Sequence, residues 1–470
     1  MTPGVITDCT MAVPFEAGIK GAATAVSTGI TALAAACAGA VVVSDLSNNR
    51  RFLAGTSTKL YEWDGATWND VSRVGSYAAG TEDRWSFIQY GNSTLTSTVT
   101  AKIQRSTGTG VAFADIAGAP QATIIESALG FALAFNTVDA TYGTSPDRWW
   151  CSALYDETNW TPAISTQCTT GRLIGGSGPI TAARRFGDDV VVYKNRTMFV
   201  GRYGGPPAVW DFKQVSNDVG CVGQEAVVDT MIGHIFCGQD NIYIYDGTTA
   251  RPLDNSTAIR NWLFADMNPL YRYKTILNWD RINYTVSIQY ASTSSASIDS
   301  CVVYHVLTKQ WGRANRAIEA SIAYVSPSLT YAGSALISTF DVGPLIPYDS
   351  PFWTAGSAVA AVFDSTHTVR TLSGTCTGSS VTTGDVGDES SYSLCDKVRL
   401  RYSLSPTTSV ATGYTRDESG TTVATSSSAS TTDGRHDMRQ RARFHRFKFT
   451  QTGNWKASAW RADLRPAGQR

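Results

Sequence analysis

The stretch LYEWDG (residues 60–65) recurs in altered form as IYIYDG (residues 242–247). In each copy, apolar and aromatic residues alternate before an Asp-Gly pair. Successive side chains of an extended chain point to opposite faces, so each copy predicts a short β-strand. Asp-Gly favours a tight turn in which glycine adopts a positive φ. We therefore interpret four residues as structural turn positions without a catalytic role: Asp64, Gly65, Asp246 and Gly247.

The distance between the two copies predicts a repeated unit. Gly65 and Gly247 are 182 residues apart in the sequence, and this distance equals four intervals of about 45 residues. Units of about 40 to 50 residues built from short strands are typical of β-propeller blades. Weaker copies complete a series of turns centred near residues 65, 108, 157, 205, 247 and 309. Six units predict a six-bladed β-propeller.

The amino-acid composition of the chain changes on both sides of this series of turns. The sequence predicts an all-β fold with an Ala/Gly-rich segment at 1–40, the propeller at 41–344 and a β-sandwich-like domain at 345–470. In the last region, VRLRYSL (398–404) alternates like a strand, whereas the Ser/Thr-rich run at 403–434 leaves a disordered tail as a second interpretation. ARFHRFKFTQTGNWKASAWRADL (442–464) predicts a hairpin with Thr452-Gly453-Asn454 at its turn.

The composition argues against several function classes. The chain has 39 basic and 39 acidic residues, so no global attraction to a polyanion is expected. Its nine cysteines form no C-x-x-C pair, which indicates buried thiols and no zinc site. HExxH, GxSxG and P-loop patterns do not occur. Residues 21–44 carry no charge but are rich in Ala, Gly, Ser and Thr, so we expect no membrane span. The sequence predicts no enzyme and no catalytic, cofactor-binding or metal-binding residue.

The C-terminal region is strongly basic. Residues 435–470 contain ten Arg and Lys residues against two Asp. One interpretation is contact with a polyanion or an acidic protein face, and the other is a solvated strand face with salt bridges to neighbouring subunits. We favour the second and leave contact with DNA open. The candidate interface patch is Arg435, Arg439, Arg441, Arg443, Arg446 and Lys448.

Several segments within residues 50–470 carry a resemblance to a known family. They include GTSTKLYEWDGATWNDVSR, RWSFIQYGN, GPITAARRFGDDVVVYKNRTMFVGRYGGPPAVWDF and RFHRFKFTQTGNWKASAWRADLRPAGQR. In their number and order they resemble the tail nozzle proteins of short-tailed bacteriophages, also called tail-tubular or packaged-DNA stabilisation proteins. Residues 1–40 match this family less well.

The resemblance implies a structural virion protein of a podovirus tail, with a propeller and an additional β domain. Such a protein forms a homo-hexameric ring below the adaptor and portal rings, contacts tail fibres or spikes, and contacts genomic DNA without sequence preference. It extends the tail tube, retains the packaged genome and opens during DNA ejection. Assembly takes place in the host bacterial cytoplasm, and no cofactor is implied. The alternative is a glycan-binding or glycan-cleaving propeller, since GATW (65–68) matches half of an aspartate box.

Overall fold

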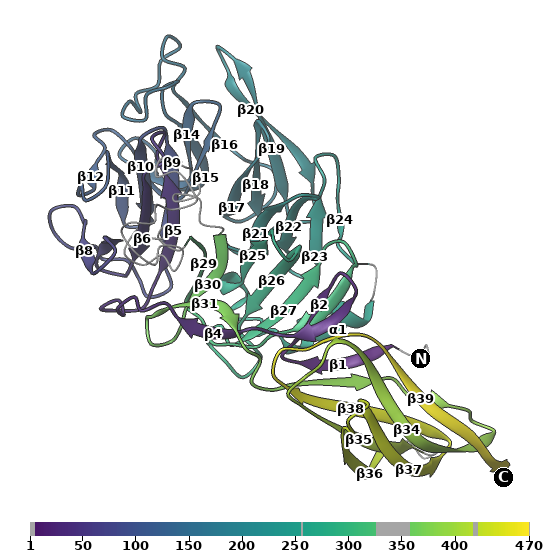
Figure 1. The fold of residues 1–470 in the computed structure, drawn as a ribbon. Helices are drawn as coiled ribbons and strands as arrows, with labels where there is room; N and C mark the ends of the chain where they lie inside the picture. The colour runs from purple at the N-terminus through teal and green to yellow at the C-terminus, as the bar shows by residue number, and fades with distance from the viewer. Residues whose placement is uncertain (1–4, 255–256, 326–357, 417–421, 470) are drawn as a thin grey trace.

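The computed structural model describes all residues except 1–4, 255–256, 326–357, 417–421 and 470. Antiparallel β-sheet makes up nearly all of its regular structure, and the helices of the described part are α1 (Thr257–Asp266) and the single turn η1 (Arg272–Lys274). A β-propeller carries a β-sandwich at its lower end in Figure 1. The predicted all-β fold, a propeller followed by a C-terminal sandwich, is confirmed.

In the described residues the propeller has seven four-stranded antiparallel blades, and in six of them the strands follow one another along the chain. Blade 1 contains β5 (Gly39–Ser44), β6 (Arg50–Gly55), β7 (Leu60–Trp63) and β8 (Trp68–Asp70), and blade 2 contains β9 (Ser86–Tyr90), β10 (Ser93–Thr98), β11 (Ala101–Ser106) and β12 (Ala114–Asp115). Blade 3 contains β13 (Gln121–Ala128), β14 (Phe131–Asp139), β15 (Gly143–Cys151) and β16 (Thr169–Arg172). Blade 4 contains β17 (Ile180–Phe186), β18 (Asp189–Lys194), β19 (Met198–Gly205) and β20 (Val209–Ser216). Blade 5 contains β21 (Val227–Thr230), β22 (Gly233–Cys237), β23 (Ile242–Tyr245) and β24 (Ala250–Pro252). Blade 6 contains β25 (Ile276–Asp280), β26 (Thr285–Tyr290), β27 (Ser300–His305) and β28 (Gln310–Arg313). Blade 7 contains β29 (Ala320–Val325), β30 (Ala358–Phe363), β31 (Val369–Gly374) and β4 (Thr24–Ser27).

The first strands of the blades go round a common axis. Each contacts the first strand of the next blade, and β29 of blade 7 contacts β5 of blade 1, which closes the ring. Buried side chains of neighbouring blades share clusters, such as Val191, Ile235 and Ile288 from blades 4, 5 and 6. A sheet with two apolar faces needs a neighbour on each side, and the closed ring supplies both.

The propeller has seven blades, so the predicted count of six is wrong. The six predicted turns all connect the third strand to the fourth strand of a blade, in blades 1 to 6. The wide interval between the last two turns contains α1 and η1. Blade 7 has no such turn, because its fourth strand β4 comes from the N-terminal part of the chain and pairs with β31. A repeat defined by that turn therefore cannot include the blade in which the chain closes the ring.

The predicted domain boundaries also differ from the structure. Blade strands extend from β4 to β31, so the propeller begins before residue 41 and continues beyond residue 344. The segment 1–40 is divided among three structures. β1 (Ile6–Thr10) belongs to the sandwich, β2 (Ala12–Phe15) and β3 (Gly18–Gly21) form a linking hairpin, and β4 completes blade 7.

The sandwich packs two sheets around one core. The first sheet has the order β1, β32 (Ser379–Thr383), β38 (Phe444–Thr452), β35 (Thr408–Arg416) and β36 (Thr422–Ala429), with β33 (Val386–Gly387) also on β38. The second contains β3, β39 (Lys456–Gln469), β34 (Ser391–Leu404) and β37 (Arg435–Ala442). Phe447 and Phe449 of the first sheet share a core with Val398, Leu400 and Met438 of the second. The described parts of the Ser/Thr-rich run form strands β35 and β36, so the tail interpretation is wrong there.

The predicted hairpin at 442–464 is not formed. β38 pairs with β32, β33 and β35, whereas β39 pairs with β3 and β34, so the two strands lie in different sheets. Phe447 from β38 and Ala457 from β39 are both buried in the sandwich core. The connection, with Gly453 at φ +81°, therefore crosses from one sheet to the other, because both strands bury an apolar face in the space between the sheets.

His234 makes the stability of the propeller dependent on pH. This side chain is fully buried, with Tyr193 Oη 2.9 Å from its Nδ1 and the Arg185 carbonyl oxygen 2.9 Å from its Nε2. Burial lowers the pKa of His234 from 6.5 to about 4. Between these values the unfolded chain binds a proton that the folded chain does not, so stability falls as the pH falls from 6.5 to 4. We expect this side chain to contribute a loss of roughly 2.5 kcal/mol between pH 7.5 and 4.5, measured by urea unfolding. His234→Asn should reduce the difference in stability between the two pH values by about that amount.

Candidate interaction surface

The four predicted turn residues form two equivalent turns. Asp64 and Gly65 connect β7 to β8 in blade 1, and Asp246 and Gly247 connect β23 to β24 in blade 5. The Asp64 carboxylate accepts hydrogen bonds from the N–H groups two and three residues later, both at 2.8 Å. Asp246 accepts the same pair at 3.0 and 3.1 Å, and the glycines have φ of +103° and +97°. In both turns these backbone hydrogen bonds lower the pKa of the aspartate, for Asp64 to about 2.

The six residues of the predicted basic patch do not form one surface. Arg435, Arg439 and Arg441 alternate with buried residues along β37, in the second sheet of the sandwich. Arg446 and Lys448 alternate with buried residues along β38, in the first sheet. The buried residues of both strands meet in the core, so the two basic groups project from opposite outer faces. The sequence placed them together because β37 and β38 are consecutive in the chain.

Several members of the predicted patch have partners within the chain. Arg446 Nε lies 2.8 Å from a carboxylate oxygen of Asp385, which also binds Arg416 at 3.0 Å. Arg443 lies between β37 and β38, and its guanidinium is 5.2 Å from the centre of the Tyr392 ring. Arg441 lies 5.0 Å from the same ring. Of the two basic residues of the predicted patch on β38, Arg446 is therefore paired within the chain, sharing Asp385 with Arg416.

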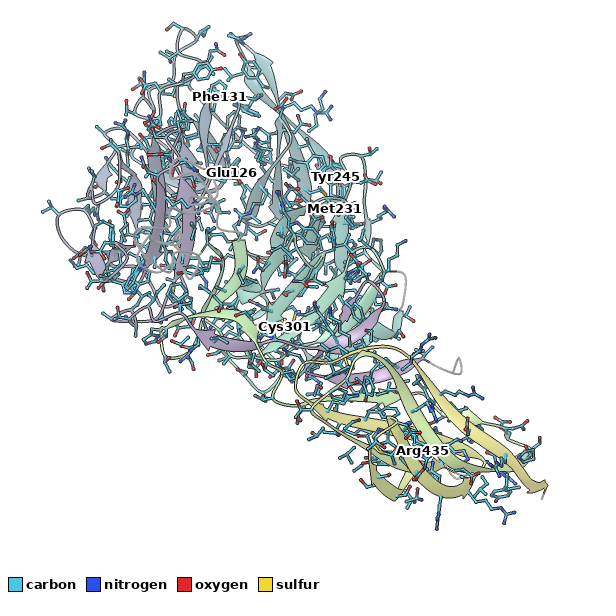
Figure 2. All side chains as sticks on the ribbon, viewed as in Figure 1. Glu126, Phe131, Met231, Tyr245, Cys301 and Arg435 are labelled. Atoms are coloured by element: carbon cyan, nitrogen blue, oxygen red, sulfur yellow. The ribbon has the colours of Figure 1, made fainter. Side chains whose placement is uncertain are left out.

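The outer face of the second sheet joins Arg435 of the predicted patch, labelled in Figure 2, to arginines that the sequence analysis did not include in that patch. Arg399 of β34 is directly opposite Arg435 of β37 on one side and Arg461 of β39 on the other. Cross-strand neighbours have Cβ atoms about 5 Å apart, and like charges in such positions destabilise a sheet. Arg399 and Arg461 are exposed, as is Arg401 two residues further along β34. We define Arg399, Arg401, Arg435, Arg439, Arg441 and Arg461 as the arginine face.

Acidic residues interrupt this face in the next row. Lys397 is directly opposite Asp437 and Asp463, with its Nζ 3.2 Å from an Asp463 carboxylate oxygen. That contact lowers the pKa of Asp463. Arg435 lies 3.2 Å from Asp437, whereas no hydrogen bond or ion pair joins Arg399 to another described residue. Cross-strand rows of net positive and net negative charge therefore alternate on this face, and the positive charges outnumber the negative ones.

One end of the propeller axis is bridged by side chains. Glu82, just before blade 2, lies 2.7 Å from Lys274 Nζ and accepts a hydrogen bond from Tyr273 at 3.1 Å, both just before blade 6. Arg84 lies 3.6 Å from Glu225, just before blade 5. Blade 2 faces blades 5 and 6 across the ring, so these contacts cross the axis. These side chains therefore obstruct this end of the propeller axis.

The described residues contain no group of three His, Cys, Asp or Glu side chains that could hold a metal ion. Four of the five histidines are fully buried, and burial lowers the pKa of each: His234, His305, His436 and His445. The fifth, His367, lies 2.7 Å from Glu319. All nine cysteines are free thiols, and eight are buried. Within the described part of the chain, no helix combines the length and the apolar character needed to cross a membrane.

An aromatic groove of about 430 Å³ lies between blades 3 and 4. Trp149, Trp210 and Phe212 line it together with the polar side chains of Arg172 and Gln214. Trp149 is 6 % exposed and Trp210 is 3 % exposed, so their rings mainly fill the space between the blades. The Trp210 indole N–H has no hydrogen-bond partner in the described structure.

No family model matches the sequence, and no curated protein gives a significant match. Among solved structures, the chain is similar to the WD40 domain of Neurospora crassa Pan2, with 7 % identity over 78 % of this chain and 96 % of that one and a TM-score of 0.40. It is also similar to YCF48 bound to D1 peptide, with 15 % identity over 62 % and 84 % of the chains and a TM-score of 0.36. The computationally designed Ika8 protein shows 11 % identity over 74 % and 99 %, with a TM-score of 0.37. Likeness at this level concerns the fold, and it assigns no function to the chain.

Proposed function

We propose that this chain is the structural subunit of a tail nozzle in a short-tailed bacteriophage. Six copies form a ring in the virion below the adaptor and portal rings, contact fibres or spikes, extend the DNA channel, and hold the genome until ejection. The segments quoted from residues 50–470 support the family resemblance. The architecture, in which a propeller is joined to a sandwich by paired strands, supports a mechanical role.

The observation that carries this proposal is the continuous sheet joining the two modules. Blade 6 continues through β28, β2, β3, β39, β34 and β37, so one nine-stranded sheet connects the propeller to the sandwich. Ala12 pairs with Arg313 of blade 6, and Ile19 pairs with Ala457 of the sandwich. Backbone hydrogen bonds resist bending between the modules better than a flexible linker does. A rigid two-part body suits a subunit that must transmit force within a ring.

The arginine face is the surface on which we place a contact between subunits or with the adaptor. Its alternating rows of Arg and Asp fit a protein face of complementary pattern better than DNA, since Asp437 and Asp463 would repel phosphates. Heterologous ring interfaces join two different faces of the same chain. Exposed arginines kept side by side at an energetic cost are consistent with a partner that neutralises them.

Reversing charge on the arginine face is expected to prevent ring assembly. The double variant Arg399→Glu/Arg439→Glu should raise the dissociation constant of the ring at least tenfold, because two attractive contacts become repulsive. Native mass spectrometry or light scattering would measure this. Arg196→Glu, which changes an exposed arginine on blade 4, should leave assembly unchanged. If the double variant assembles normally, this face is not the interface.

The whole proposal is tested by mass measurement of the purified protein, alone and mixed with adaptor or portal rings of a short-tailed phage. Hexamers, or capture of six copies by an adaptor ring, are the expected results. A strictly monomeric protein that ignores those rings would contradict the nozzle assignment, even if the arginine face bound another partner.

Glycan binding is the second candidate function, and the aromatic groove between blades 3 and 4 favours it. Sugars pack against aromatic rings and take hydrogen bonds from indole N–H, guanidinium and amide groups, all of which line this groove. A glycan array with intact protein tests it. Saturable binding that is lost in Trp210→Ala, together with a monomeric state, would favour this candidate over the nozzle.

A further inference from the structure

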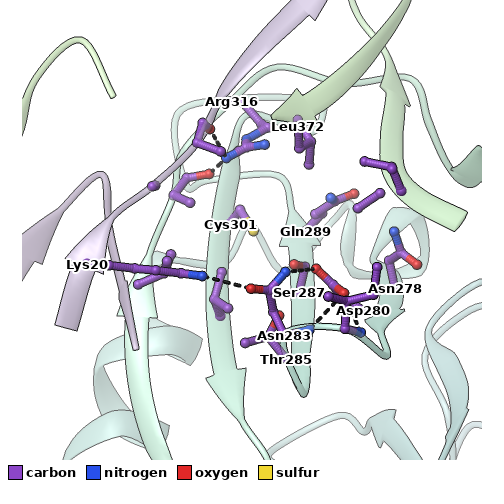
Figure 3. A pocket seen from close by; sticks show the side chains of 18 of the residues that line it. Lys20, Asn278, Asp280, Asn283, Thr285, Ser287, Gln289, Cys301, Arg316 and Leu372 are labelled. Carbon is purple, nitrogen blue, oxygen red and sulfur yellow. Dashed lines mark hydrogen bonds between the residues drawn. The ribbon is translucent and has the colours of Figure 1, made fainter. Parts of the chain in front are cut away.

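A polar pocket lies where blades 6 and 7 meet the N-terminal strands. It has a volume of about 150 Å³ and is lined by strands of blade 6, by β30 and β31 of blade 7, and by residues around β3. Contacts between propeller blades are usually apolar, but here Gln289 and Arg316 face the pocket together with Lys20 (Figure 3). The pocket therefore lies on the seam at which the propeller closes.

Arg316 is a half-buried cation that has no carboxylate partner among the described residues. Its Nε lies 3.3 Å from the Ala314 carbonyl oxygen, and its Nη2 lies 3.3 Å from that of Ala23. The remaining nitrogen, Nη1, is buried and has no hydrogen-bond partner in the described structure. Burial lowers the pKa of this guanidinium, but arginine stays charged at neutral pH. A buried charge without a counter-ion is costly, so the site favours an anion from outside the chain.

The neighbouring groups do not supply the missing negative charge. Asp280 is the one carboxylate among the residues that line the pocket, and its oxygens already accept bonds from the Ile282 N–H at 2.9 Å and the Asn283 side chain at 2.7 Å. Lys20 donates to Asn283 at 2.8 Å and adds a second positive charge. The lining therefore has two cations against one carboxylate, and that carboxylate is committed to a turn.

Gln289 provides a further polar group. It is 2 % exposed, and its side-chain oxygen has no hydrogen-bond partner in the described structure. A half-turn of the amide exchanges its oxygen for its NH₂ group at almost no steric cost. In that orientation Gln289 offers a donor in the pocket that Arg316 also lines. Both unpartnered side chains are then satisfied by one acceptor with several oxygens.

We propose that this pocket binds a small oxyanion, such as inorganic phosphate or a short carboxylate, through Arg316 and Gln289. The volume of about 150 Å³ admits a group of this size. Arg316 also holds the carbonyl of Ala23, next to β4, and Leu372 of β31 lines the same pocket. The bound anion neutralises the guanidinium and thereby stabilises the closure of the propeller between blades 6 and 7.

The test is a thermal unfolding series on the full chain in phosphate, sulfate, acetate and chloride at equal ionic strength. We expect a saturable rise of about 2 to 3 °C at 100 times the dissociation constant for the preferred oxyanion, and none for chloride. Comparing the rise in unfolding temperature in phosphate and sulfate with that in acetate shows whether the site prefers a tetrahedral or a planar anion. Titration calorimetry with the best anion gives the dissociation constant directly.

Matched variants separate this site from general salt effects, which act on any protein surface. Arg316→Gln should abolish the saturable rise, and Gln289→Leu should weaken binding at least threefold. Arg196→Gln removes an exposed arginine elsewhere and should behave like the parent protein. The proposal is overturned if the parent shows no saturable rise, or if Gln289→Leu binds the anion as tightly as Arg196→Gln. The comparison of anion binding by Gln289→Leu and Arg196→Gln can be made even if Arg316→Gln fails to fold.

Discussion

Replacing Glu62 by Ala is expected to lower the free energy of unfolding by about 3 to 5 kcal/mol. Glu62 forms a bidentate ion pair with Arg51, with nitrogen–oxygen distances of 2.9 and 2.8 Å. Both side chains are 3 % exposed. Removing the carboxylate leaves a buried guanidinium uncompensated, which costs far more than the loss of an exposed salt bridge. Urea unfolding at neutral pH measures the difference.

The large effect also depends on contacts between blades. Arg51 of blade 1 donates to Thr94 of blade 2 at 3.1 Å, and Glu62 accepts a hydrogen bond from the Gly110 N–H at 3.0 Å. The pair therefore joins blade 1 to blade 2. The double variant Arg51→Met/Glu62→Leu should recover much of the loss, because it removes both charges from the interior.

An exposed pair on the same blade provides the control. Lys59 and Asp70 lie 2.7 Å apart with side chains 36 % and 44 % exposed. Lys59→Met should cost at most about 1 kcal/mol. If Glu62→Ala and Lys59→Met lower the free energy of unfolding by equal amounts, burial does not determine how much an ion pair contributes to stability.

The repeat of the propeller could be predicted from sequence because its signal is local. Asp64-Gly65 and Asp246-Gly247 recur in equivalent turns, and the four blade intervals between them set the spacing. The closure of blade 7 could not be predicted from that spacing. β4 and β31 pair through residues such as Ser27 and Arg370, which are far apart in the chain. Pairing at such a distance leaves no pattern inside a short window of sequence.

The candidate surface was predictable in part for the same reason. The alternation in VRLRYSL places Val398 and Leu400 on one face of a strand and Arg399 on the other, and the structure has this arrangement. The alignment of Arg399 with Arg435 and Arg461 requires knowledge of which strands pair and in which register. The assumption that consecutive strands form hairpins failed at β38 and β39, where a shared core separates the strands into two sheets.

Deleting residues 1–28 is expected to destabilise both modules and to uncouple their unfolding. The deletion removes β1 from the sandwich, the β2–β3 link, and β4 from blade 7. With a net contribution of about 1 kcal/mol per hydrogen bond, the lost pairings amount to roughly 5 kcal/mol or more. Calorimetry should show one main transition for the full chain and two transitions, both lowered, for the truncated chain. Deletion of residues 1–4 leaves β1 to β4 in the chain and should keep the single main transition of the full chain.

A point substitution distinguishes the link from the closing strand. Gly18 has φ +145°, and a Cβ atom there would lie 2.2 Å from the Ala457 carbonyl oxygen. Gly18→Val therefore forces β3 away from β39 while β4 remains in blade 7. We expect it to separate the two transitions and to leave the propeller transition close to that of the full chain. Gly378→Val, with open space around the added atoms, is the matched control. A single unshifted transition in Gly18→Val would mean that the pairing of β3 with β39 does not couple the modules.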